Sequence, residues 1–362
     1  MPGLGALPLR HGLQGVQPYG APQIDAPVRL NVNENPYPPS SRVVADIAAA
    51  VTRAAAGLNR YPDRDAFELR CALADYLDHG VGPEQVWAAN GSNEIMLQLH
   101  QAFGGPEGKS LSFAPTYSMY PEYARDTMTP WVTGRRDEHF RLDLEHAVHL
   151  IETEQPSLVM LASPNNPTGT ALSIRDIEVL CRAAPGLVVV DEAYAEFRRA
   201  GAPTALSLLP AHSHLVVTRT MSKAFALAGA RLGYLAADRA VVEALRIVRL
   251  PYHLSSVTQA VAVAALRHSG ELLARVDELR TERDETVGWL RAQGLEVPDS
   301  DANFALFGRF GDRHAVWRGL LTRGVLVRET GPDGWLRVSI GTRNEMRTFR
   351  AALLEVLTHA EI

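Results

Sequence analysis

The sequence of 362 residues contains only two cysteines, Cys71 and Cys181, which lie far apart and form no Cys-x-x-Cys pair. Neither a disulfide framework nor a zinc site is expected from them, so we predict no bound metal and a location in the reducing cytoplasm. No apolar run approaches the roughly 20 residues that cross a bilayer. The N-terminus, interrupted by prolines and glycines, lacks the pattern of a secretory signal.

A surplus of positive charge is also missing. The chain has 36 Lys and Arg residues against 41 Asp and Glu residues, which gives a net charge of −5, and both signs are scattered along it. A protein that binds a phosphate backbone needs a basic stripe to neutralise it. We therefore predict no nucleic acid and no membrane among the partners, and we expect small molecules as ligands.

What the chain does have is enough apolar sequence for a large core. At 362 residues and 46% hydrophobic content, it exceeds the size at which a single core usually stops growing, so one large and one smaller domain are expected. Residues 1–40 are rich in Pro, Gly and Asn, which predicts an extended arm that lies on other parts of the protein.

From about residue 41 to 255 we expect a large α/β domain. Helix-like stretches alternate there with short apolar runs, at 86–89, 111–113, 158–162, 187–190 and 215–217. Their continuous hydrophobicity is typical of strands that are covered on both faces, and it predicts a mostly parallel sheet between layers of helices.

The remaining residues, 256–362, are expected to form a long connecting helical stretch and a small α+β domain. The helical pattern ends near Gly294 and Pro298. Short strands are predicted at 304–307, 325–327 and 336–340, and a final helix at about 344–358.

Polar motifs follow four of the predicted strands. They are Asn90-Gly91-Ser92-Asn93, the 163–169 loop, Asp191-Glu192 and the segment around Lys223. Ligands of open parallel α/β sheets bind at the carboxyl ends of the strands, so the four motifs are predicted to meet at one site.

Each motif also has a purely structural interpretation. The Gly91-Ser92 turn before a helix favours an anion such as a phosphate, yet Ser92 or Asn93 could be an ordinary N-cap. The 163–169 loop contains turn-forming residues and could be only a loop.

The acidic pair and the lysine carry more information. A carboxylate at the end of a buried strand is costly without a cationic partner. Asp191 is expected either to cap the next helix or to pair with a pyridinium nitrogen, as in pyridoxal-phosphate enzymes. Lys223 lies among small and apolar residues, where desolvation would lower its pKa and favour the nucleophilic amine; the alternative is a solvated surface lysine. Because all four motifs stand in order at strand ends, a single site is the better interpretation.

With these motifs the chain resembles the fold-type I pyridoxal-phosphate enzymes, and among them the histidinol-phosphate aminotransferase family. The resemblance spans nearly the whole chain through ordered motifs at 30–36, 60–63, 115–120, 165–169, 191–194, 222–225 and 336–342. It implies an α/β large domain with a mostly parallel sheet of the seven-stranded type, a small α+β C-terminal domain, an extended N-terminal arm and pyridoxal 5'-phosphate as cofactor.

The resemblance also implies roles around the cofactor. Lys223 would hold it as a Schiff base and then move a proton between the substrate and the cofactor. Asp191 would keep the pyridine nitrogen protonated, Asn166 and Tyr194 would bond the phenolate oxygen, and Tyr117 would stack on the ring. The other expected cofactor contacts, mostly to the phosphate, are Gly91, Ser92, Asn93, Thr220, Ser222, Arg231 and, from a partner subunit, Tyr61.

Substrate contacts are implied in the same way. Arg337 resembles the clamp for a substrate carboxylate, although it could be a rim arginine on an edge strand. Tyr19 from the arm, Tyr61 from the partner and Arg328 correspond to the groups that recognise histidinol phosphate, and further candidates are Asn33, Asn93 and Tyr252. Most of the family carries Asp in place of Asn93, and an amide can donate to a phosphate. Because the loop between Arg328 and Arg337 is short, the direction in which the Arg328 side chain points stays open.

The resulting functional prediction is a homodimeric transaminase. It would convert L-histidinol phosphate and 2-oxoglutarate to imidazole acetol phosphate and L-glutamate by a ping-pong route, in histidine biosynthesis. An aromatic amino-acid aminotransferase and a phospho-amino-acid decarboxylase share the fold, although the 222–229 run favours transamination. A ligand-sensing domain of a transcription regulator would need an attached DNA-binding module, for which the short arm leaves no room.

Overall fold

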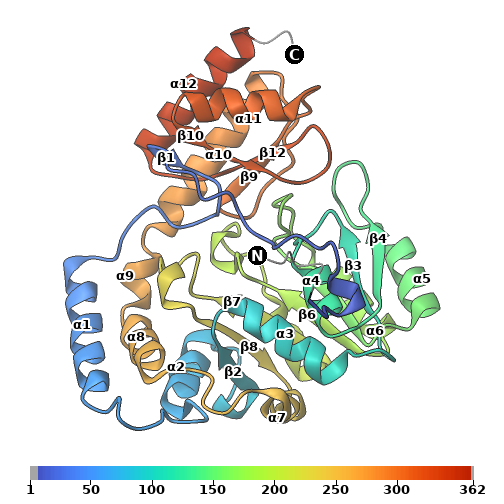
Figure 1. Ribbon diagram of the computed structural model, residues 1–362, viewed down its shortest axis with the longest axis vertical. Helices are drawn as coiled ribbons and strands as arrows, with labels where there is room; N and C mark the ends of the chain where they lie inside the picture. The colour runs from blue at the N-terminus through green and yellow to red at the C-terminus, as the bar shows by residue number, and fades with distance from the viewer. Residues whose placement is uncertain (1–6, 360–362) are drawn as a thin grey trace.

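A computed structural model describes residues 7–359; residues 1–6 of the predicted arm and residues 360–362 lie outside the described part. The molecule has a large body built around one sheet and a smaller body formed mainly by the last quarter of the chain (Figure 1). None of the helices within 7–359 is long and apolar enough to cross a membrane.

The large body contains a seven-stranded sheet, in the order β2-β8-β7-β6-β5-β3-β4. The strands are β2 (Val86–Ala89), β3 (Ser110–Ala114), β4 (Trp131–Arg135), β5 (Leu158–Ala162), β6 (Leu187–Asp191), β7 (Leu215–Thr220) and β8 (Gly233–Ala237). Only β8 runs antiparallel to its neighbours, while β7, β6, β5, β3 and β4 are parallel. The predicted mostly parallel sheet is confirmed, and β4 and β8 are strands that the apolar runs did not predict.

Helices cover both faces of this sheet, which explains the continuous hydrophobicity of its strands. Alternate strand residues enter two separate cores: Val188 and Val190 pack on one face, and Leu187 and Val189 on the other. The first face is covered by α2 (Phe67–Leu77), α5 (Leu144–Glu154), α6 (Ile174–Ala183) and α8 (Ser256–Leu266), with α1 (Ser41–Ala55) outside α8; the second is covered by α3 (Ser92–Phe103), α4 (Tyr120–Asp126) and α7 (Arg239–Val248).

The small body has its own core and sheet. Strands β11 (Arg328–Glu329), β12 (Leu336–Ser339) and β9 (Phe304–Phe307) form an antiparallel sheet in that order. Helices α10 (Val276–Ala292), α11 (Arg313–Thr322) and α12 (Arg343–His359) pack around it.

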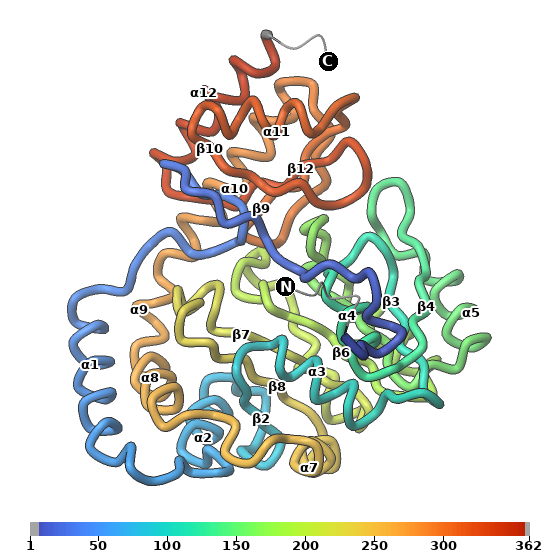
Figure 2. Tube along the Cα trace, in the orientation of Figure 1, coloured from blue at the N-terminus to red at the C-terminus, as the bar shows by residue number. Residues whose placement is uncertain are grey.

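The N-terminal arm joins the two bodies. Its strand β1 (Val28–Arg29) pairs in parallel with β10 (Val325–Leu326) of the small body. Further towards the N-terminus, the arm crosses to the short helix η2 (His11–Leu13), where Arg10 donates to the Asp126 carbonyl beside α4 (Figure 2). Residues 14–35 therefore run across the gap between the bodies.

The helical stretch expected after Pro251 is divided into α8, α9 (Ser269–Leu273) and α10. Helix α8 contributes Ala262 and Ala265 to the core of the large body, whereas α10 belongs to the core of the small one. The domain boundaries of the sequence stay a prediction, and this packing favours placing the second boundary near Val276. The other short helices are η3 (Pro83–Gln85), η4 (Ala195–Phe197), η5 (Ala205–Ala211) and η6 (Ala228–Ala230).

Candidate active site

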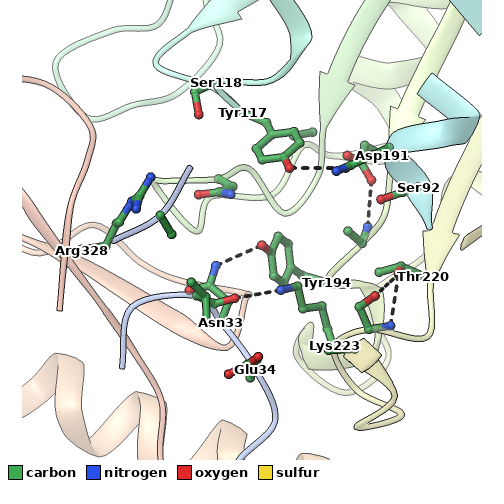
Figure 3. Close-up of a pocket in the computed structure, with 18 of the residues that line it drawn as sticks. Asn33, Glu34, Ser92, Tyr117, Ser118, Asp191, Tyr194, Thr220, Lys223 and Arg328 are labelled. Atoms are coloured by element: carbon green, nitrogen blue, oxygen red, sulfur yellow. Dashed lines mark hydrogen bonds between the residues drawn. The ribbon is translucent and has the colours of Figure 1, made fainter. Parts of the chain in front are cut away.

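A cavity of about 460 Å³ lies where the carboxyl ends of β5, β6 and β7 face the arm and the small body (Figure 3). All four motifs contribute to its wall. The predicted site residues in the wall are Tyr19, Asn33, Ser92, Asn93, Tyr117, Asn166, Asp191, Tyr194, Thr220, Ser222, Lys223, Arg231, Arg328 and Arg337. Gly91, which precedes Ser92, is not among the lining residues, and Tyr61 and Tyr252 lie elsewhere on the surface.

Lys223 follows the end of β7, and its amine points into the cavity, where it donates to the Val32 carbonyl at 2.9 Å. Burial lowers the pKa of this amine to about 8, and the positive charge of Arg337 acts in the same direction. The neutral, nucleophilic amine therefore forms at a much lower pH than it does for an ordinary lysine. The alternative of a solvated lysine is wrong.

Asp191 ends strand β6 and is almost completely buried. It accepts hydrogen bonds from the Tyr120 hydroxyl at 3.0 Å, the Thr218 hydroxyl at 3.2 Å and the Ala193 N–H at 3.2 Å. Burial raises the pKa of this carboxyl despite these hydrogen bonds. Within residues 7–359 it has no cationic partner, so the site leaves a buried carboxylate for a positively charged group of a ligand.

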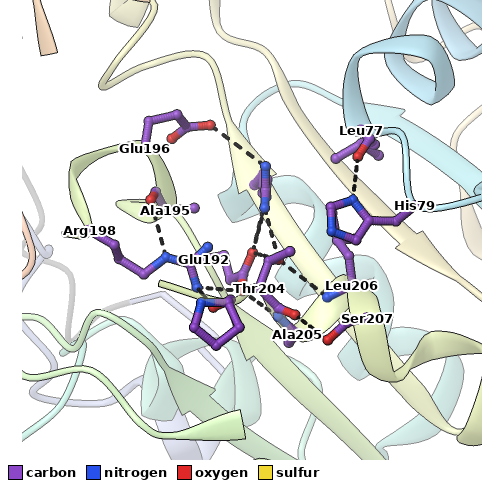
Figure 4. A network of polar contacts seen from close by, with 12 residues as sticks. Leu77, His79, Glu192, Ala195, Glu196, Arg198, Thr204, Ala205, Leu206 and Ser207 are labelled. Atoms are coloured by element: carbon purple, nitrogen blue, oxygen red, sulfur yellow. Dashed lines mark hydrogen bonds and ion pairs between the residues drawn. The ribbon is translucent and has the colours of Figure 1, made fainter. Parts of the chain in front are cut away.

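Glu192, the next residue, has the opposite environment (Figure 4). Its carboxylate forms ion pairs with Arg219 at 2.8 Å and with Arg198 at 3.1 Å, and it accepts from the Thr204 hydroxyl and the Ala205 N–H. Burial acts to raise its pKa, but the two arginines outweigh burial and hold the pKa below its usual value. Of the two adjacent acids, only Asp191 lacks a cationic partner among residues 7–359.

The helix that follows Gly91 offers backbone N–H groups in its first turn, although the Gly91 N–H itself donates to the Ala89 carbonyl at 2.8 Å. Helix α3 begins at Ser92 with Gly91 as its N-cap, and no side chain caps its first turn. The structural interpretation, in which Ser92 or Asn93 caps the helix, is therefore wrong. Gly91 has φ +81°, a backbone conformation that favours glycine, and a Cβ there would lie 2.7 Å from the Arg231 guanidinium, which would have to move. A helix N-terminus and a guanidinium thus converge where an anion would bind.

Thr220 and Ser222 complete this side of the cavity. The Ser222 N–H donates to the Thr220 hydroxyl at 3.1 Å, and the two hydroxyls are 3.0 Å apart. Arg231 approaches Ser222 at 3.5 Å. These hydroxyls extend the set of donors around the Gly91 turn.

Two arginines line the opposite side, on the small body. Arg328 and Arg337 are direct partners across the antiparallel strands β11 and β12. Like charges in that position destabilise a sheet unless an anion lies between them. Arg337 is buried, which lowers its pKa to about 10, and it donates to Asn166 at 2.6 Å and to the Asn31 carbonyl at 2.9 Å. Within the described residues, Arg337 Nε and Arg328 Nη1 are buried without a hydrogen-bond partner.

The remaining predicted residues in the wall differ in their freedom to contact a ligand. Tyr19 lies over the cavity, 3.4 Å from the Ser118 hydroxyl, and Tyr117 donates to Asn93 at 3.5 Å. Asn33, predicted as a substrate contact, instead uses its side chain on Tyr194 and Ser339.

Tyr61 and Tyr252 are not brought to the cavity of their own chain. They stack on each other with ring centroids 4.4 Å apart, and they are 80% and 40% exposed. Both belong to a surface formed by segments 58–67 and 247–252, which are tied together by Arg249, whose guanidinium contacts Asp65 at 3.2 Å.

Sequence reasoning assigned no role to Tyr120, Thr218 or Glu34. Tyr120 and Thr218 hold Asp191, and Glu34 lies in the cavity wall, where its charge raises the pKa of Lys223. Thr218 could have been found, because it lies two residues before Thr220 and therefore on the same side of strand β7.

Comparison with known proteins defines the class first. Residues 26–353 match the family model described as aminotransferase class I and II. The histidinol-phosphate aminotransferase of Thermobifida fusca is 62% identical over 348 residues, covering 96% of this chain and 95% of the relative. Histidinol-phosphate aminotransferase 3 of Burkholderia lata is 59% identical over 358 residues, covering 98% and 97%.

Solved structures agree with this class. The histidinol-phosphate aminotransferase from Sinorhizobium meliloti, in complex with pyridoxal-5'-phosphate, superposes with a TM-score of 0.84 at 25% identity, covering 97% of this chain and 98% of that one. The chain therefore belongs to the class I and II aminotransferases and, within them, to the histidinol-phosphate aminotransferase family. The fold-type I architecture and the resemblance inferred from the motifs are confirmed.

Proposed function

We propose that the protein transfers the amino group of L-histidinol phosphate to 2-oxoglutarate, with pyridoxal 5'-phosphate as cofactor, in histidine biosynthesis. The observation that carries the proposal is that one cavity contains both a buried lysine amine with a lowered pKa and a buried carboxylate. That carboxylate has no cationic partner among residues 7–359. These two groups are what a pyridine aldehyde needs for attachment and for a charged ring nitrogen.

The rest of the cavity fits the cofactor as well. The anion site at the Gly91 turn matches its phosphate, because unpaired N–H groups and the nearby Arg231 converge there. Arg337 binds the oxygen of the Asn166 amide, so the N–H groups of that amide are the ones left for the phenolate oxygen. When bound, the cofactor supplies an electron sink for the electrons of the substrate Cα–H bond.

The protein's own groups then have defined tasks. The Lys223 amine would hold the cofactor and, during the reaction, would accept the proton from the substrate Cα and donate it again to complete the transfer. Its lowered pKa suits this task, since a base works best when its pKa lies near the working pH. Asp191 keeps a positive charge at the ring nitrogen, and Tyr120 and Thr218 hold the carboxylate in position.

The arginine pair supports a phosphorylated substrate. Both substrates carry an anionic group near the reacting carbon. The α-carboxylate of glutamate is bonded directly to that carbon, whereas the phosphate of histidinol phosphate lies further away, beyond a methylene group and an ester oxygen. Arg328 and Arg337 are adjacent and have buried N–H groups without a partner among the described residues, so an anion there would relieve both unpaired donors and like-charge repulsion.

Replacing Arg328 by Ala tests the substrate assignment. We expect kcat/KM for histidinol phosphate to fall by roughly 10- to 100-fold through KM, because one charge-assisted contact to the phosphate is lost. The value for phenylalanine should change much less. Steady-state kinetics on both substrates measure this, and Arg323→Ala, which removes a surface arginine paired with Glu355, is the control. Equal losses for both substrates would argue for an aromatic amino-acid aminotransferase.

A homodimer is part of the proposal. Large hydrophobic side chains are exposed along the surface that contains Tyr61 and Tyr252, namely Leu58, Tyr61, Phe67, Ile247, Leu250 and Tyr252. Exposed apolar patches of this kind are typical of protein interfaces. A second copy covering this surface would carry both tyrosines towards the neighbouring cavity, which is the role predicted for Tyr61, and Tyr252 would act with it. A cytoplasmic location also stays a prediction.

Mixing two inactive variants tests the shared site. Lys223→Ala and Tyr61→Ala should each lose most of their activity. A mixed dimer of the two should regain up to about one half of the wild-type activity per dimer, because one of its two cavities then has both residues. The mixture is assayed after subunit exchange. If Tyr61 acted within its own chain, each subunit of the mixed dimer would lack one of the two residues that its cavity needs. No activity would then return.

A further inference from the structure

Three consecutive residues of the arm each contact a different side chain of the candidate site. The Asn31 carbonyl accepts from Arg337 at 2.9 Å, the Val32 carbonyl accepts from Lys223 at 2.9 Å, and the Asn33 amide donates to the Tyr194 hydroxyl at 3.0 Å. The last two contacts are visible in Figure 3. The segment 31–33 therefore links the small body to Lys223 and Tyr194 of the large body.

Asn33 anchors this segment. It is buried and has φ +56°, a backbone conformation that asparagine tolerates better than most residues. The Ser339 hydroxyl accepts from the backbone N–H of Asn33 at 2.8 Å and donates to the side-chain oxygen of Asn33 at 2.9 Å. The Asn303 side chain donates to the backbone carbonyl of Asn33 at 3.0 Å. Ser339 and Asn303 both belong to the small body, and Ser339 lies on β12 two residues after Arg337.

The direction of the bond to Tyr194 has a chemical consequence. With its oxygen engaged by Ser339, the Asn33 amide presents its N–H to the Tyr194 oxygen, so the hydroxyl accepts this bond. Burial raises the pKa of the Tyr194 phenol, which therefore keeps its proton. The Tyr194 hydroxyl must therefore donate its proton to an acceptor other than Asn33. Because the hydroxyl lies in the cavity wall, that acceptor can be a group inside the cavity.

We infer that Asn33 is a positioning residue: it holds the Tyr194 hydroxyl so that its proton is donated into the cavity, towards the phenolate oxygen of the cofactor. The inference rests on the proposed function. Since Asn33 is fixed by Ser339 and Asn303, the orientation of Tyr194 depends on the attachment of the arm to the small body. Asn33 thus acts through Tyr194 and is not itself a substrate contact.

The test is a pH titration of the visible absorption band of the purified, cofactor-loaded protein. A donor to the phenolate stabilises the deprotonated form, so its loss raises the pH midpoint. In Asn33→Gly, which removes the amide but tolerates the positive φ, we expect the midpoint to rise by about one pH unit, as for one lost hydrogen bond to a charged group. Tyr194→Phe should raise it at least as much.

The double variant distinguishes positioning from general structure. In the Tyr194→Phe background, Asn33→Gly should cause no further rise, because the hydroxyl on which it acts is absent. Asn35→Ala is the matched control: Asn35 also ties the arm to the large body, through the Ala224 carbonyl, but does not touch Tyr194, and its midpoint should equal that of the wild type. Lys223, Asp191 and Arg337 are unchanged in every variant.

Two results would overturn the inference: an unshifted midpoint in Asn33→Gly, or equal shifts with and without the Tyr194 hydroxyl. If Asn33→Gly does not fold, Ser339→Ala takes its place, with a smaller rise expected in the wild-type background and none in Tyr194→Phe. A wild-type protein without a visible band would instead contradict the proposed function, so the two failures are distinguishable.

Discussion

Lys223→Ala should abolish both the visible absorption band of the Schiff base and all measurable turnover. The chain contains only two lysines, Lys109 and Lys223. Lys109 is partly exposed and forms a surface ion pair with Glu154 at 2.8 Å, whereas the Lys223 amine is buried in the cavity with a pKa of about 8. Lys223 thus combines a lowered amine pKa with a position in the cavity, where it can reach a bound pyridine aldehyde.

The scarcity of lysine makes this test unusually clean. Borohydride reduction of the cofactor-loaded protein, followed by peptide mass spectrometry, should place the label on Lys223 alone. Lys109→Ala should keep the band, the label and the activity. A label on Lys109, or transamination by Lys223→Ala, would refute the assignment of Lys223.

Asp191→Asn should lower kcat by roughly 10²- to 10⁴-fold. The estimate follows from about 3–5 kcal/mol for breaking a buried charge pair by removal of one partner. An amide is nearly isosteric with the carboxylate and can still accept from Thr218 and Ala193, so the fold should be kept. Without the negative charge, the ring nitrogen loses the partner that favours its protonated form. Steady-state kinetics measure the loss.

Glu192→Gln is the matched control for this variant, because the two acids are adjacent and both are buried. Glu192 is paired with Arg219 and Arg198, so its loss should lower the free energy of unfolding by about 3–5 kcal/mol. Asp191→Asn should not destabilise the cofactor-free protein, since it removes a buried carboxylate without a cation from the described residues. Equal destabilisation by both variants would mean that Asp191 serves the fold and not the cofactor.

The sequence predicted well which polar side chains follow the ends of the strands at the site. Continuous apolar runs identified β5, β6 and β7, and the side chains directly after such runs must meet at one edge of a parallel sheet. Asp191 and Lys223 could therefore be located without coordinates. The same rule missed β8, because Gly233 and the alanines after Leu235 do not look like a strand in isolation.

Contacts that depend on how distant segments meet could not be predicted. Arg328 and Arg337 are adjacent only because β11 and β12 pair in one particular register. Asn33 lies hundreds of residues before Ser339, and only the arm's course across the small body brings them together. The stacking of Tyr61 on Tyr252 likewise requires the 247–252 segment to return to the first helices.

The half-reaction with histidinol phosphate tests the central claim most directly. The cofactor-loaded protein is mixed with histidinol phosphate, phenylalanine or tyrosine without a keto-acid acceptor, and the loss of the visible band is followed over time. We expect histidinol phosphate to discharge the band with the highest second-order rate constant, and 2-oxoglutarate to restore it. A band that phenylalanine or tyrosine discharges at least as efficiently as histidinol phosphate would contradict the proposed substrate.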